Sequence, residues 1–323
     1  MPGPVLVAPD SFKGTFSATE VAAALARGLR AGGRDVVELP VADGGEGTMD
    51  ALLAALGGER RTAIVADPLG RPVEAAYGRL TDGSAIVESA QASGLGLVSE
   101  ADRDAWAAST YGTGELIAAA AREGASRILV AVGGTATTDG GSGAIEALEK
   151  AGVEVQLVVL SDVLTPWEDA PRVFGPQKGA DSETVVRLER RLEELADSAP
   201  RDPTGNILTG AGGGLAGGLW AWGAEVVPGA RFVLDTVGFD EKLVGAALCV
   251  TGEGSLDDQT AAGKIVGEIA ARCLAAGIPC HAVVGRNQLG PEALGLAGVV
   301  EARTLEGLEA AGRSFATLGG RRS

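Results

Sequence analysis

Short apolar runs alternate with segments of helical periodicity along most of the chain. An apolar run, a turn-forming stretch and then a 3.6-residue period are typical of a strand followed by a helix. We therefore expect strands at 5–8, 36–40, 128–132, 155–160, 246–250, 282–285 and 299–302. Helices should cover 18–32, 49–56, 114–122, the residues before 150, 183–196, 265–274 and 305–315. Ser17 and Glu20 match a capping box, which sets the start of the first helix.

The pattern changes after Thr62, where three β segments joined by turn sequences predict antiparallel pairing (64–67, 73–80 and 85–88). The two chain ends share a βα rhythm that this middle region lacks. A length of 323 residues favours two domains. We expect an α/β protein in which residues 1–62 plus 265–323 form one parallel-sheet domain. Residues 63–264 form a second, inserted α/β domain, with the active site in the cleft between them.

The composition of the chain argues against several classes of function. The formal charge of −16 argues against nucleic acid and anionic membranes, which both reward clustered Lys and Arg. No apolar run approaches the ~20 residues of a membrane span, and the first four residues lack signal-peptide features, so a cytoplasmic protein is expected. Cys249, Cys273 and Cys280 lie in apolar surroundings and are expected as buried free thiols. His281 is expected as a strand residue, which leaves a carboxylate or a lysine as general base.

The segment from Val250 to Lys264 concentrates the chemistry, because it holds three carboxylates, glycines and a lysine between a strand and a helix. Glycine lets backbone N–H groups approach an anion, and carboxylates hold Mg²⁺, so the segment is typical of a phosphate and metal site. It does not match a P-loop. A plain polar turn is the alternative.

Three further strand–loop–helix junctions carry similar residues: Asp10 to Gly14, Asp43 to Thr48, and Gly133 to Gly143. Open α/β sheets bind ligands at the carboxyl ends of their strands, which is where these loops are expected. Asp-Ser turns and acids at a helix N-terminus can also occur without any ligand.

The run from Gly212 to Gly217 satisfies G-x-G-x-x-G, with Asp235 at a distance suited to a ribose contact. The preceding residues, 206–209, form only a weak strand pattern, and the run lies in mid-chain. Close packing of a glycine-rich helix from Leu215 to Trp222 is the simpler interpretation, and a dinucleotide site is not expected.

Five ordered motifs together resemble the type-1 glycerate kinase family: residues 7–14, 40–48, 133–141, 174–180 and 250–264. The resemblance implies phosphorylation of glycerate by ATP with Mg²⁺, usually at the 2-hydroxyl, giving 2-phosphoglycerate. It also implies a flavodoxin-like domain built from both chain ends and a central domain with a restriction-enzyme-like mixed sheet. The implied partners are glycerate and ATP, without nucleic acid or membrane, and a homodimer is left open.

With this family as guide, site residues can be assigned as hypotheses. The catalytic candidates are Asp10, Lys13, Asp43, Asp139 and Lys264, with Asp10 or Asp139 as base. The candidates for binding substrate or phosphate are Ser11, Gly44, Gly45, Gly134, Thr135, Gly140, Lys178, Gly252 and Gln259. The candidates for holding metal are Asp43, Glu46, Asp162, Glu253 and Asp257.

Two other interpretations remain open at this stage. One is an ATP-dependent kinase of another small hydroxy acid. The other is a non-catalytic binding protein derived from a glycerate kinase, suggested by a region between Lys150 and Ser161 that is shorter than the family pattern.

Overall fold

A computed structural model describes residues 3–12, 14–256 and 264–318 of the chain. It divides into two compact units, residues 1–43 with 230–323 and residues 44–229. The boundaries differ from the expected ones, because 44–62 lie in the second unit and 230–264 in the first. The second shift follows from strand pairing: the strand that starts at Leu248 is hydrogen-bonded within the sheet of the first unit.

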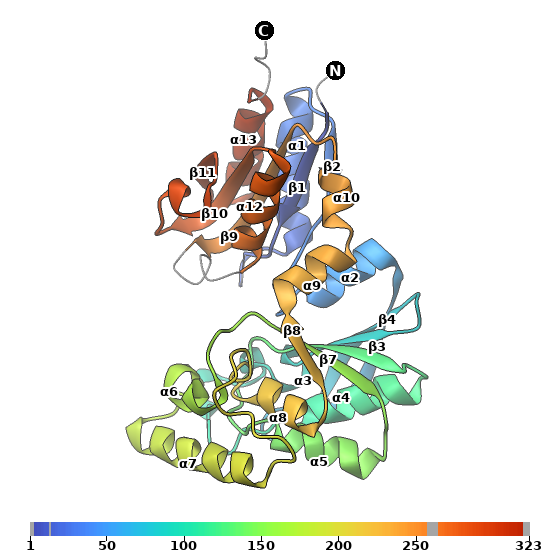
Figure 1. Cartoon of the computed structure of the whole chain (residues 1–323), viewed down its shortest axis with the longest axis vertical. Coiled ribbons are helices and arrows are strands. Elements are labelled where there is room, and N and C mark those ends of the chain that lie inside the picture. The colour runs from blue at the N-terminus through green and yellow to red at the C-terminus, as the bar shows by residue number, and fades with distance from the viewer. Residues whose placement is uncertain (1–2, 13, 257–263, 319–323) are drawn as a thin grey trace. The chain divides into compact units, whose positions relative to one another are not determined.

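The first unit contains a five-stranded parallel sheet (Figure 1). Its strands are β1 (Val5–Pro9), β2 (Val36–Glu38), β9 (Leu248–Leu256), β10 (Cys280–Asn287) and β11 (Gly298–Glu301). Their order is β11-β10-β9-β1-β2. Numbered within the unit, this is the order 2-1-3-4-5 of flavodoxin-like folds, so the expected architecture is confirmed.

Helices cover both faces of this sheet. α1 (Ala18–Ala31) and α13 (Leu305–Ala316) pack on each other and share one apolar core with β1 and β9. α12 (Ile265–Ala276) packs on β9 and β10, and α9 (Gly229–Thr236) and α10 (Phe239–Leu243) precede β9. The predicted capping box is present, since the Ser17 side chain accepts from the Glu20 N–H and the Glu20 carboxylate accepts from the Ser17 N–H.

The second unit contains a six-stranded mixed sheet in the order β3-β4-β5-β6-β7-β8. These strands are β3 (Gly58–Ala66), β4 (Pro72–Leu80), β5 (Ala85–Glu88), β6 (Arg127–Ala131), β7 (Gln156–Ser161) and β8 (Glu225–Pro228). The first three are antiparallel, as predicted, and β5 to β8 are parallel. The α/β class with one parallel and one mixed sheet is therefore confirmed.

The helices of the second unit are α2 (Thr48–Leu56), α3 (Ala90–Ser93), α4 (Tyr111–Arg122), α5 (Ser142–Ala151), α6 (Ala170–Phe174), α7 (Ser182–Ser198) and α8 (Leu215–Trp222). Short 3-10 turns cover Leu95–Leu97, Glu100–Asp102, Trp167–Asp169, Pro176–Lys178 and, in the first unit, Pro291–Leu294. α4, α5 and α8 contribute to one core with β5, β6 and β7.

Two local predictions need correction. Residues 206–209 contain no strand, because 207–209 form turns and Leu208 has a φ of 74°, which lies outside the strand region. The strand predicted at 246–250 runs on to Leu256, so Glu253 lies within β9.

Three other predictions are confirmed. α8 is closely packed, since a Cβ on Gly218 would lie 2.0 Å from the Gly140 carbonyl oxygen. The three cysteines are buried free thiols. His281 lies in β10 with its ring 5.1 Å from that of Phe315, and burial lowers the pKa of His281. No helix in the described part of the chain is long and apolar enough to cross a membrane.

Candidate active site

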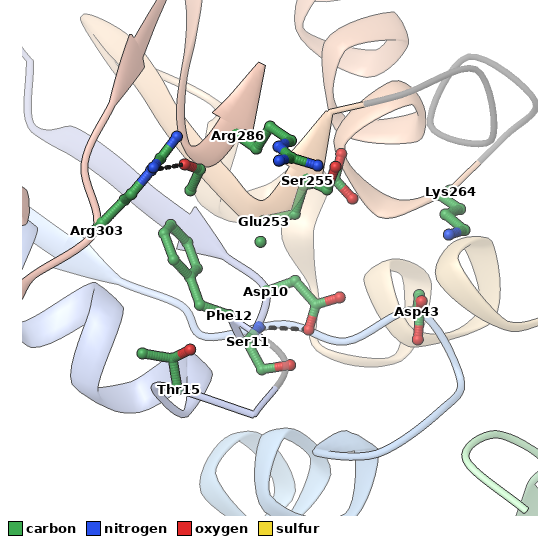
Figure 2. A pocket seen from close by; sticks show the side chains of 12 residues that line it. Asp10, Ser11, Phe12, Thr15, Asp43, Glu253, Ser255, Lys264, Arg286 and Arg303 are labelled. Carbon is green, nitrogen blue, oxygen red and sulfur yellow. Dashed lines mark hydrogen bonds between the residues drawn. The ribbon is translucent and has the colours of Figure 1, made fainter. Parts of the chain in front are cut away.

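A pocket of about 470 Å³ opens in the first unit where β1, β9 and β10 approach their carboxyl ends (Figure 2). The strand order reverses direction between β1 and β9, which is the switch point where flavodoxin-like sheets bind ligands. The residues that line the pocket are Asp10, Ser11, Phe12, Thr15, Asp43, Glu253, Gly254, Ser255, Lys264, Gly285, Arg286 and Arg303.

Three buried carboxylates face this pocket. Asp10 follows the last residue of β1, and its Oδ1 accepts a hydrogen bond of 2.5 Å from the Ser11 N–H. Asp43 and Glu253 are each only 8% exposed. Burial of several acids around one polar cavity is costly unless cations or hydrogen-bond donors accompany them. The arrangement therefore indicates a place for positively charged groups.

Cations lie around the same pocket. Lys264 is the N-cap residue of α12, and Figure 2 shows its ammonium group on the same side as Asp43. Arg286 and Arg303 lie on other sides of the cavity in that view. Arg303 donates to the Gly285 carbonyl oxygen at 2.8 Å. Sequence reasoning missed both arginines, although their positions at the carboxyl ends of β10 and β11 could have indicated them.

Three predicted site residues, Lys13, Asp257 and Gln259, lie outside the described residues. The structure gives Gly252 a packing role. A Cβ at that position would lie 2.3 Å from the carbonyl oxygen of Val283 in the neighbouring strand β10. The absence of a side chain is thus required by the sheet itself.

In the second unit, two of the glycine-rich loops meet. Gly45 and Glu46 lie against Gly133 and Gly134, so close that a Cβ on Gly134 would overlap a Glu46 carboxylate oxygen at 1.9 Å. Gly134 also has a φ of 67°, which favours glycine. Glu46 and Gly134, separated by most of a hundred residues in sequence, therefore lie in contact. Their common role in a ligand site stays a prediction.

Glu88 fixes the first of these loops and was not predicted. Its Oε1 accepts from the Gly47 N–H at 2.9 Å and the Met49 N–H at 2.8 Å. The start of α2 has no side-chain cap of its own, so this carboxylate from the end of β5 serves instead. Burial raises the pKa of Glu88 to about 7, although the two backbone hydrogen bonds oppose the rise.

Asp139 is completely buried within the second unit. Its two oxygens accept from the Thr110 N–H and hydroxyl and from the N–H groups of Gly141 and Gly143, at 2.8 to 3.2 Å. Four donors supplied by the fold give this carboxylate a structural task at the starts of α4 and α5. Its proposed catalytic task, and its convergence with Asp43 and Glu253 on one cleft, stay predictions.

Lys178 is buried beside the same loop. Its Nζ donates to the Thr137 carbonyl oxygen at 2.5 Å and to the Thr135 hydroxyl at 3.4 Å. Burial lowers the pKa of Lys178 to about 7, while the charge of Asp139 acts in the opposite direction. A lysine held in this way next to hydroxyl groups can receive an anion, because an anion restores the stability of its charged form.

The remaining predicted residues differ in placement. Gly44 begins the second unit next to Asp43 in the chain, and Asp162 follows β7. Gly140, with a φ of 64°, packs on the Trp167 ring. The last contact shows that one predicted ligand-binding glycine is also needed for core packing.

Comparison with known proteins gives one consistent result. The family model described as the glycerate kinase family matches residues 5–153 and 149–310. The glycerate kinase of Bacillus subtilis (strain 168) is 37% identical over 323 residues, covering 87% of this chain and 84% of the relative. The glycerate 2-kinase of Escherichia coli (strain K12) is 36% identical over 302 residues, covering 81% and 79%.

A solved structure shows the same similarity in three dimensions. The crystal structure of a Salmonella typhimurium LT2 protein that carries the name glycerate kinase 2 matches with a TM-score of 0.83 and 32% sequence identity. The match covers 98% of this chain and 98% of that chain. Both sheets therefore have counterparts in a solved structure.

Proposed function

The chain belongs to the glycerate kinase family, and on this premise we propose that it phosphorylates D-glycerate with ATP and Mg²⁺ to give 2-phosphoglycerate. The observation that supports the proposal most directly is the pocket at the β1–β9 switch point, where buried acids and cations face one cavity. Phosphoryl transfer asks a protein to position two substrates and to neutralise charge, and this pocket offers both kinds of group.

We propose Asp10 as the base that accepts the hydroxyl proton of glycerate. Asp10 follows a rigid buried strand, and the Ser11 N–H fixes one of its oxygens. Asp139 is the weaker candidate, because its oxygens already accept four hydrogen bonds from the fold. A base held on a strand end can meet a hydroxyl within hydrogen-bond reach.

The acids of the pocket fit a magnesium ion that comes with the nucleotide. Among the described residues, no three carboxylates converge closely enough to hold a metal by themselves. Mg²⁺ usually takes one or two carboxylates and completes its shell with phosphate oxygens and water. Asp43 and Glu253 are the proposed ligands, and the bound ion supplies charge neutralisation at the phosphates.

Cations complete the proposed assignment. Lys264, Arg286 and Arg303 line the pocket and suit the phosphate groups of ATP. Lys178, beside the Thr135 hydroxyl, is proposed to bind an anionic group of a substrate. ATP and glycerate are accordingly the proposed small-molecule partners.

The experiment that tests the proposal is NMR of the product formed from D-glycerate and ATP. We expect a phosphorus signal coupled to the proton on carbon 2, together with one ADP for each product molecule. A product phosphorylated at carbon 3 would contradict the proposed position while keeping the kinase activity. Turnover of a different hydroxy acid in a substrate panel, with glycerate inert, would contradict the proposed substrate.

A further inference from the structure

Three cysteine side chains meet on one face of the first unit's sheet. Cys249 in β9 and Cys280 in β10 are direct neighbours in the parallel ladder, so their side chains point to the same face. Cys273 comes from α12, which packs on both strands. The three Sγ atoms all lie within 4.8 Å of one another.

The cluster is separate from the candidate active site. Cys249 pairs with Leu6 near the start of β1, whereas the pocket residues lie toward the other end of the strands. All three thiols are at least 97% buried and none forms a disulfide. Free cysteine is often a simple core residue. Three sulfur atoms within 4.8 Å of one another also offer three ligand atoms at one place.

Distances between the sulfur atoms suit a single metal ion. A thiolate–metal bond of about 2.3 Å in a flat three-ligand site places the sulfur atoms about 4.0 Å apart. Because no pair is more than 4.8 Å apart, small side-chain movements suffice to reach this geometry. The backbone elements need no rearrangement.

Among the residues that the structure describes, the set of possible ligands at this place consists of sulfur atoms alone. His281, next to Cys280, packs its ring on Phe315 of α13, which covers the opposite face of the sheet. Asp240 is the nearby carboxylate whose charge affects Cys273, and it is paired with Arg272 at 3.2 Å. Structural zinc sites take four ligands, whereas this cluster offers three. Soft thiolate ligands also select Cu(I), so Cu(I) suits the cluster better.

We propose that Cys249, Cys273 and Cys280 form a three-sulfur site that binds one Cu(I) ion. Each thiol that binds releases its proton to solvent, and no electron is transferred. The ion would join β9, β10 and α12 through their side chains.

The test is an anaerobic titration of the reduced full-length protein with Cu(I) supplied by a coloured chelator. We expect one Cu(I) per chain, three sulfur neighbours in the X-ray absorption spectrum and a higher melting temperature, because the ion binds the folded state. Binding should strengthen as the pH rises, since protons are released. The proposal would be overturned if the protein did not compete with the chelator for Cu(I) or bound several ions per chain. Nitrogen and oxygen neighbours of the ion in the X-ray absorption spectrum would also overturn it.

Single substitutions of the three cysteines test whether these residues hold the ion. Cys249→Ala, Cys273→Ser and Cys280→Ala should each weaken binding by about 100-fold or more, since even the outer partners of metal ligands are worth 10–100-fold. Met49→Leu removes a buried sulfur in the second unit and serves as the matched control, with unchanged affinity expected. A folded Cys273→Ser protein that binds Cu(I) as tightly as the unmodified chain would contradict the proposal. If a variant does not fold, the X-ray absorption spectrum of the unmodified chain shows whether three sulfur atoms hold the ion.

Discussion

At the scale of single residues, carboxylates in this fold differ in task according to the donors around them. Asp139 receives four hydrogen bonds from neighbouring loops and helix starts. Asp43 instead faces a cavity that also contains lysine and arginine side chains. Two buried aspartates from glycine-rich motifs can therefore be separated by experiment into a functional and a structural one.

We predict that Asp43→Asn abolishes glycerate phosphorylation and leaves the melting temperature nearly unchanged. The substitution keeps size but removes the charge that the proposed magnesium site needs. Asp139→Asn is the matched comparison and should lower the free energy of unfolding by about 2–4 kcal/mol, because a buried amide nitrogen would face N–H donors. Kinetics and thermal unfolding of both variants check this. A large loss of stability in Asp43→Asn would make that residue structural.

The pH dependence of stability should reveal Glu88. Burial raises the pKa of Glu88 from the ordinary value of 4.5 to about 7. The folded state therefore binds the proton of Glu88 more tightly than the unfolded state does. The resulting stabilisation is complete below pH 4.5 and is lost as the pH rises through about 7. Glu88→Gln cannot ionise, so it should gain up to about 3 kcal/mol over the unmodified chain across this window. Urea unfolding at several pH values measures the difference, and a constant difference would contradict the prediction.

At the scale of elements, helix α12 packs on the first unit's sheet and begins next to the pocket. Lys264 is its N-cap residue, and α12 packs on both β9 and β10. The packed helix fixes the backbone of Lys264 at the edge of the pocket, which favours binding of an anion there.

We predict that Lys264→Ala lowers kcat/KM for ATP-dependent glycerate phosphorylation by about 100-fold or more, since one preorganised donor is typically worth that much. Lys150→Ala, which removes a lysine near the end of α5 beside the Tyr111 ring, is the control and should keep normal kinetics. Steady-state kinetics with ATP varied at saturating glycerate make the comparison. Normal kinetics in Lys264→Ala would remove Lys264 from the site.

Most elements could be predicted because their periodicity agrees with local signals. The capping box of Ser17 and Glu20 and the apolar run at Val5 to Ala8 are local and were found in the structure. β9 was predicted too short, because Gly254 and Ser255 have weak strand preference and their conformation depends on pairing with β10.

The site was predictable only in part, for a physical reason. Asp10, Asp43 and Glu253 belong to recognisable glycine-rich motifs, and the structure brings them to one pocket. Arg286 and Glu88 lie at strand ends without any motif, so their positions depend on sheet order and on contacts distant in sequence. A position at a strand end is a weak signal in the sequence, and it identifies such partners only once the order of the strands is known.

At the scale of the whole molecule, the two units differ in how the chain builds them. The second unit uses the single continuous segment 44–229, and its main core draws only on that segment. The first unit needs both chain ends, because β1 pairs with β2 on one side and with β9 on the other.

We predict that a fragment of residues 44–229 folds cooperatively by itself and lacks kinase activity. A continuous chain with its own core contains what a domain needs to fold, whereas the acids and cations of the pocket belong to the other unit. Circular dichroism during thermal unfolding and an ADP assay check the two parts. A fragment without a cooperative transition would contradict the first part, and ADP formation would contradict the second.

The position of β9 between β1 and β10 has a consequence for biosynthesis. Thr251 donates its hydroxyl to the carbonyl of Ala8, a partner 243 residues earlier in the chain. At about 5–20 residues per second, a ribosome needs roughly 12–50 s to produce the second partner after the first. During that interval the newborn β1 has one open edge while the middle segment can already fold. The open edge of β1 can therefore pair prematurely with another strand until β9 leaves the ribosome.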